Sequence, residues 1–180
     1  MKILAFAASN SKQSINKQLV SYSANQLAAL KPHAEIEILD LNDYEMPIYS
    51  IDREQESGIP QKALDFLTKI KEADLLMISF AEHNGNYSSA YKNIFDWSSR
   101  SEQKIFQQTN TILMATSPGA RGGLSVLELA KNTAPFFGAN LLGTLSIPSF
   151  YDNFDSKTQT LTNEALQTQL VDILKTVEEK

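Results

Sequence analysis

Hydrophobic runs alternate with amphipathic segments along the chain. Five short, mostly apolar runs predict strands at residues 2–8, 35–41, 74–80, 111–116 and 140–147. Five longer segments repeat apolar residues every three or four positions and predict helices at 16–30, 61–72, 89–99, 124–137 and 163–177. Continuous apolar strands are typical of a parallel sheet that is covered on both faces. The run 35–41 instead alternates charged and apolar residues, which places it nearer a sheet edge.

This alternation predicts a three-layer α/β sandwich, in which helices cover both faces of a five-stranded parallel sheet. The first and third strands are the ones followed by polar loops, which favours the flavodoxin-like strand order 2-1-3-4-5. The length of 180 residues suits one such domain over 1–180. Segments 42–60 and 148–159 are expected to lack regular structure, and loops of that length often cover a site or form an interface.

Composition excludes several classes of protein. The chain has no Cys, so it cannot hold a disulfide scaffold, a thiolate nucleophile or an iron–sulfur cluster. A net charge of −5 without a basic block argues against nucleic-acid binding. No apolar run approaches the roughly 20 residues that span a bilayer, and the short N-terminal run is better explained as a first strand than as a signal peptide. We therefore expect a cytoplasmic protein.

The loop after the first strand is rich in hydrogen-bond donors. Ser9, Ser11 and Ser14 supply hydroxyls, Asn10 and Asn16 supply amides, and Lys12 supplies a positive charge. The loop runs into a predicted helix, and the free N–H groups of a helix start bind anions. Simple helix capping is the alternative, although one cap needs only one such residue. The loop has no Gly and matches neither the dinucleotide fingerprint nor the Walker A motif.

The loop after the third strand, residues 81–87, contains the turn-forming pair Asn84 and Gly85. A tight turn exposes backbone donors and acceptors that can read the edge of a planar heterocycle. The neighbouring His83 and Tyr87 can stack on such a ring or add hydrogen bonds. An ordinary turn is the alternative for this loop.

The loop after the fourth strand, residues 117–123, is rich in glycine. Gly119, Gly122 and Gly123 are three of the seven glycines of the chain, which suggests backbone lying close against a ligand. Arg121 can offset negative charge on a reduced ring or a cofactor phosphate. A flexible turn is the alternative. All three loops are expected at the carboxyl edge of the sheet, where ligands of open α/β folds bind.

Three segments, in order, resemble the NADPH-dependent FMN reductase family of flavodoxin-like proteins, which includes quinone, chromate and azo-dye reductases. Residues 82–85, continuing into 92–97, resemble the PEYNxS…LKNxxDW signature, and the start of the chain resembles GSxRxxSxN. The glycine-rich loop is similar to the third loop of the family, and the resemblance extends to about residue 146. Four positions depart from the family pattern: Ala8, Lys12, Ala81 and His83.

The resemblance implies an FMN site, with the phosphate on the first loop and the isoalloxazine against the other two. The cofactor-binding residues implied by the three loops together are Ser9, Ser11, Lys12, Ser14, Asn16, Glu82, His83, Asn84, Gly85, Asn86, Tyr87, Ser117, Gly119, Arg121, Gly122 and Gly123. It also implies a homodimer or a dimer of dimers, in which the helix carrying Trp97 and segment 42–60 meet the partner.

The implied reaction is that of an NAD(P)H oxidoreductase. NADPH or NADH passes hydride to the flavin, and a quinone, flavin or similar small acceptor then takes the electrons. The flavin carries this chemistry, so neither a catalytic side chain nor a metal is expected. Two alternatives stay open: an FMN-binding electron-transfer module without nicotinamide turnover, and a phosphate-site enzyme without flavin, such as a nucleotide hydrolase or transferase.

Overall fold

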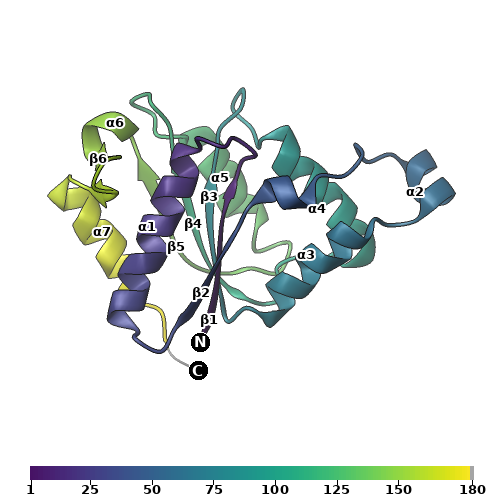
Figure 1. Ribbon diagram of the computed structural model, residues 1–180, viewed down its shortest axis with the longest axis horizontal. Helices are drawn as coiled ribbons and strands as arrows, with labels where there is room; N and C mark the ends of the chain where they lie inside the picture. The colour runs from purple at the N-terminus through teal and green to yellow at the C-terminus, as the bar shows by residue number, and fades with distance from the viewer. Residues whose placement is uncertain (179–180) are drawn as a thin grey trace.

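The computed structural model describes residues 1–178 and contains a five-stranded sheet in the order β2-β1-β3-β4-β5 (Figure 1). Every neighbouring pair of strands is parallel. The strands are β1 (Lys2–Ala8), β2 (Glu35–Leu39), β3 (Leu75–Phe80), β4 (Asn110–Thr116) and β5 (Asn140–Ile147). The predicted fold class and strand order are confirmed.

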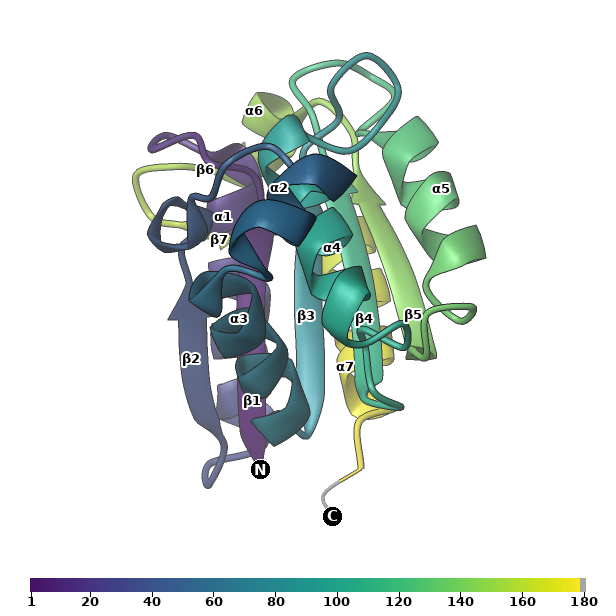
Figure 2. The same cartoon turned by 90° about the vertical axis from the view of Figure 1, so that its right-hand side faces the viewer.

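Helices cover the sheet on both faces (Figures 1 and 2). One face carries α1 (Ile15–Leu30) and α7 (Glu164–Lys175), and the other carries α3 (Gln61–Glu72), α4 (Ser89–Ser101) and α5 (Leu124–Thr133). Alternate residues of β1 pack into the apolar clusters on the two faces of the sheet, because successive strand residues point to opposite faces. Ile3 and Ala5 join the cluster under α1, whereas Leu4 and Phe6 join the cluster under α3 and α4.

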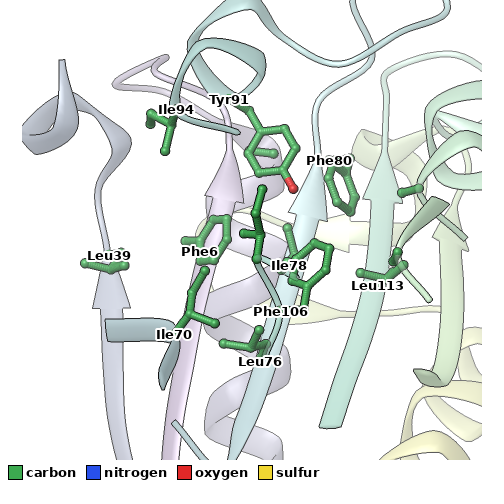
Figure 3. Close-up of a cluster of buried hydrophobic side chains, with 14 of the residues drawn as sticks. Phe6, Leu39, Ile70, Leu76, Ile78, Phe80, Tyr91, Ile94, Phe106 and Leu113 are labelled. Carbon is green, nitrogen blue, oxygen red and sulfur yellow. The ribbon is translucent and has the colours of Figure 1, made fainter. Parts of the chain in front are cut away.

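The cluster of apolar residues under α3 and α4 ends in aromatic residues close to the carboxyl edge of the sheet (Figure 3). Phe80, the last residue of β3, packs edge-to-face on Tyr91 of α4 with ring centroids 5.4 Å apart. Phe6 lies tilted against Tyr91 at 6.4 Å and meets Phe66 of α3 edge-to-face at 5.6 Å. The loop after β3 therefore stands on an aromatic layer.

Segments 42–60 and 148–159 contain regular structure, so their prediction as irregular was wrong. The first holds most of a 3-10 turn, η1 (Leu41–Tyr44), and a short helix, α2 (Ile51–Ser57). The second holds α6 (Phe150–Asn153) and β6 (Phe154–Asp155), which pairs with β7 (Thr160–Leu161). Helix α2 buries no residue, so no hydrophobic period marks it in the sequence.

Strand β2 and helix α5 end earlier than predicted. Strand β2 ends at Leu39, because the Asp40 side chain accepts a hydrogen bond from Asn42 N and begins the 3-10 turn. Helix α5 ends at Thr133 instead of continuing to residue 137. Pro135 follows and has no N–H to donate to Lys131 O, so the helical hydrogen bonds stop there, although Ala134 keeps helical backbone angles (φ −56°, ψ −42°).

Segment 42–60 folds against α4 of its own chain. Trp97 Nε1 donates to Pro47 O at 2.7 Å, and Asn93 Oδ1 accepts from Tyr49 N at 2.8 Å. Trp97 is only 1% exposed, so its indole packs inside the chain. Across residues 1–178, no helix is both long enough and apolar enough to cross a bilayer.

Candidate cofactor-binding site

The loops after β1, β3 and β4 meet at the carboxyl edge of the sheet, with α6 beside them (Figures 1 and 2). They border an open cleft of about 240 Å³. The side chains that reach it from the three loops include Ser9, Ser11, Ser14, Glu82, His83 and Ser117. The structure thus brings the predicted first, second and third loops to one place.

The first loop is a chain of small turns closed by hydroxyl groups. Ser9 Oγ accepts from Ser11 N at 3.2 Å, and Ser11 Oγ accepts from Gln13 N at 3.3 Å. Ser14 caps α1, and its Oγ accepts from Lys17 N at 3.1 Å. Each hydroxyl oxygen accepts one hydrogen bond from the backbone, and its own proton remains available to donate to a ligand. The three protons and the free N–H groups of the α1 start suit a phosphate monoester.

Asn16 uses its side chain inside the protein. It is 3% exposed, and its Nδ2 donates to Thr116 O at 3.2 Å. Its Oδ1 accepts from Ser79 Oγ at 2.8 Å and from Thr116 N at 3.0 Å. The side chain therefore ties α1 to the ends of β3 and β4, and its backbone N–H is what remains for a ligand.

The two lysines of this region differ in their partners. Lys17 Nζ lies 2.6 Å from Asp40 Oδ2, and this hydrogen bond, with that from Asn42 N, lowers the pKa of Asp40 to about 2. Lys12 is exposed and has no carboxylate within ion-pair distance among residues 1–178. Lys12 is therefore the charge of the first loop that is available to an anion.

The second loop is a hairpin turn, as its sequence predicted. Asn84 and Gly85 have φ of +53° and +74°. His83 N donates to Asn86 O at 2.9 Å, and Asn86 N donates to His83 O at 3.1 Å. Two central residues with positive φ are characteristic of the type I′ turn, which Asn-Gly pairs favour. The backbone of this loop is thus fixed, and the exposed His83 lines the cleft.

Tyr87 attaches this loop to α5 and to the aromatic layer under it. Its hydroxyl lies 3.1 Å from Thr133 Oγ1 at the end of α5, and burial raises its pKa. Its ring packs 5.4 Å from Phe80 and 5.1 Å from Tyr91. Tyr87 is therefore part of the aromatic layer, and it does not line the cleft.

Glu82 connects the second loop to the third. Its Oε2 accepts from Val126 N at 3.1 Å, in the first turn of α5. A carboxylate at a helix start is stabilised by unpaired N–H groups and by the helix dipole. Glu82 therefore helps to fix where α5 begins.

Two of the three glycines of the third loop, Gly122 and Gly123, are explained by their backbone conformation and by contacts within the chain. Gly122 has φ +59°, and a Cβ there would lie 2.8 Å from Pro148 N. Gly123 has φ +72° and precedes α5. Arg121 is exposed, and its Nη2 donates to Ser125 Oγ at 3.0 Å. These three residues and Gly119 border the site region without lining the cleft itself.

The residues near the site that sequence reasoning missed include Thr116, Ser88 and Tyr151. Thr116 lines the cleft and donates from Oγ1 to Ile147 O at 2.7 Å. Ser88 is buried, caps α4 and donates to Ala8 O at 2.8 Å, which ties α4 to the end of β1. Tyr151 of α6 lines the cleft. The position of Ser88 before a predicted helix was a visible capping signal, whereas the contacts of Thr116 and Tyr151 depend on long-range folding.

Comparison with known sequences gives a consistent family. A model of the NADPH-dependent FMN reductase family matches residues 1–152. The chain is 33% identical over 124 residues to 2-hydroxy-1,4-benzoquinone reductase from Burkholderia sp., covering 68% of this chain and 63% of that enzyme. It is 26% identical over 171 residues to NADH-dependent flavin reductase subunit 2 from Lactobacillus johnsonii, covering 91% of this chain and 88% of that protein.

Solved structures share the fold at low identity. The flavoenzyme NAD(P)H:(acceptor) oxidoreductase FerB from Paracoccus denitrificans superposes with a TM-score of 0.72 at 22% identity, covering 97% of this chain and 95% of its own. A flavodoxin variant from Pseudomonas aeruginosa gives 0.58 at 10% identity, covering 97% of each chain. On the strength of the match over residues 1–152, this chain belongs to the NADPH-dependent FMN reductase family, which implies FMN as cofactor and a reduced nicotinamide as electron donor.

Proposed function

We propose that this protein uses bound FMN to oxidise NADPH or NADH and to reduce a quinone, a flavin or a similar small acceptor. The observation that carries the proposal is the hydroxyl-rich start of α1, which shares one cleft with residues of the two neighbouring loops. When bound, FMN supplies the chemistry, because its ring takes up hydride from the nicotinamide and releases electrons to the acceptor.

The first loop would hold the phosphate of FMN. Ser9, Ser11 and Ser14 each keep a hydroxyl proton that can be donated to a phosphate oxygen. The N–H groups of Ile15 and Asn16 lie in the first turn of α1, where the helix has no acceptor for them. Lys12 adds a full positive charge. Lys12 lines a neighbouring pocket and not the cleft itself, and it offsets part of the charge of a dianionic group, which no carboxylate of the first loop opposes.

The second and third loops would hold the ring. The hairpin at Asn84 and Gly85 follows directly on His83, which lines the cleft, and Ser117 of the third loop lines the same cleft. Of the titratable residues that line the cleft, Glu82 is already engaged by Val126 N, which leaves His83 and Tyr151. The protein would therefore act by binding and orienting the reactants, and no side chain is assigned as a nucleophile or base.

We also propose a homodimer as the assembly. Ile48 and Ile51 of segment 42–60 are 76% and 50% exposed, and Ile48 shares a pocket with residues of α4. Exposed apolar residues of this kind are what a subunit partner covers. Light scattering should give twice the chain mass for the wild type, and the double variant Ile48→Glu/Ile51→Glu should lower that mass toward one chain.

The test of function begins with the visible spectrum of the purified protein before and after addition of FMN. We expect a flavin spectrum that stays with the protein through gel filtration, together with NADPH or NADH oxidation that depends on an added quinone. A flavin-loaded protein without nicotinamide turnover would indicate an electron-transfer module. A protein that does not take up FMN would overturn the proposal.

A further inference from the structure

The exposed aromatic residue Tyr151 lines the cleft without being part of the three loops. It is 66% exposed and belongs to α6, which follows β5. It borders the cleft together with Ser9, Ser11 and Ser14 of the first loop. A large aromatic side chain left in water beside a phosphate-type donor set calls for an explanation.

The segment that carries Tyr151 is held rigidly against the third loop. Ser149 adopts a left-handed conformation with φ +43°, which is unusual for a residue with a side chain. Its N–H donates to Gly119 O at 2.9 Å, and the next N–H, of Phe150, donates to Ser117 O at 3.0 Å. Strained backbone that is fixed by two hydrogen bonds is typical of segments that position a functional group.

The same segment is fixed against α1. Phe150 is fully buried and stacks on Phe154 with ring centroids 4.7 Å apart. Phe154 in turn meets Tyr22 of α1 edge-to-face at 5.8 Å. Because Phe150 is the immediate neighbour of Tyr151, its anchoring determines where Tyr151 lies, and α6 sits near the start of α1 in Figure 1.

The hydroxyl of Tyr151 has no hydrogen-bond partner among residues 1–178. By contrast, Tyr49 Oη donates to Glu54 Oε2 at 3.0 Å, and Tyr87 Oη lies 3.1 Å from Thr133 Oγ1. Tyr151 thus keeps an unused donor on the same cleft as the three serine hydroxyls.

We propose that Tyr151 is a further cofactor-binding residue, whose hydroxyl donates to the phosphate of FMN and makes the site prefer FMN to riboflavin. The inference rests on the proposed function and adds a fourth hydroxyl, supplied by α6, to the phosphate donors. The residue binds the end of the cofactor that is remote from the reacting ring, so it is assigned no part in hydride transfer.

The test compares Tyr151→Phe with wild type in equilibrium titrations of FMN and of riboflavin, followed by flavin fluorescence. Losing one charge-assisted hydrogen bond should raise the Kd for FMN about tenfold. The Kd for riboflavin, which has no phosphate, should stay within about twofold of wild type. Tyr49→Phe removes a hydroxyl outside the cleft and is the matched control; it should leave both Kd values unchanged.

Two results would overturn the inference. One is an FMN Kd in Tyr151→Phe within about twofold of wild type, and the other is an equal loss for FMN and riboflavin, which would mean that the phosphate is not what the hydroxyl recognises. Neither result touches the proposed function as long as the wild type binds FMN. Failure of the wild type to bind FMN, in contrast, would remove the proposed function itself.

Discussion

The side-chain amide of Asn16 takes both backbone groups of Thr116, a residue 100 positions later in the chain. Nδ2 donates to Thr116 O at 3.2 Å, and Oδ1 accepts from Thr116 N at 3.0 Å. Asn16 Oδ1 also accepts a hydrogen bond from the hydroxyl of Ser79, which is the next-to-last residue of β3. One buried amide therefore sets the first turn of α1 relative to the strand ends from which the second and third loops leave.

We expect Asn16→Ala to lower the free energy of unfolding by about 2–4 kcal/mol, because it leaves Thr116 N, Thr116 O and Ser79 Oγ without partners in a buried place. Urea denaturation measures the change. Asn25→Ala, at an exposed position of the same helix, should change stability by less than about 0.5 kcal/mol. Equal effects in the two variants would contradict the role of Asn16.

Replacing Ser9, Ser11 and Ser14 together by Ala should weaken FMN binding by about 2–4 kcal/mol, at roughly 1 kcal/mol for each charge-assisted hydrogen bond. Titration with FMN measures the loss, and circular dichroism checks that α1 survives removal of its cap. Riboflavin lacks the phosphate, so its affinity should change far less. Unchanged FMN affinity would show that the phosphate binds elsewhere.

The Lys17–Asp40 pair should make stability depend on pH in the acid range. The pKa of Asp40 is about 2 in the folded protein, against an ordinary value of 3.8, so the pair stabilises above about pH 4 and loses its effect as the pH falls toward 2. The Asp40 side chain is 35% exposed, so solvent screening limits the contribution to about 0.5–1 kcal/mol. Asp40→Asn should cost that amount at pH 6 and almost nothing near pH 2, as measured by urea denaturation. If the difference in free energy of unfolding between wild type and Asp40→Asn were the same at pH 6 and pH 2, the predicted role of the Lys17–Asp40 pair would be wrong.

Gly122→Ala should destabilise the protein by about 2–4 kcal/mol, because the new Cβ meets backbone that cannot move aside and the residue has positive φ. Gly85→Ala is a matched control, since Gly85 also has positive φ (+74°), in the type I′ turn, but no atom within 4 Å of a Cβ position. It should cost only about 1 kcal/mol, from backbone strain alone. Thermal unfolding of the two variants separates crowding from strain.

The fold could be predicted from the sequence because most of its strands are continuous apolar runs and its main helices have a clear apolar stripe. The loops that border the site were also visible, since turn and capping residues act locally, as Ser14 and the Asn84–Gly85 pair do. What the sequence could not give are contacts made across the fold. Three features depend on the packed sheet: the hydrogen bonds between Asn16 and Thr116, the hydrogen bond from Val126 N to Glu82, and the position of Tyr151.

Helix α2 has a consequence for how the chain opens. It buries no side chain, and its Glu54 is held by Arg100 of α4 at 2.8 Å and by Tyr49 Oη at 3.0 Å, so breaking these two contacts frees most of it. Local opening there costs little, whereas the sheet and its two helical layers open only with the whole protein. Amide hydrogens of α2 should therefore exchange with solvent long before those of β3. We therefore expect α2 to be the part of the chain where a protease cuts first and where inserted residues are best tolerated, because neither change disturbs the cleft.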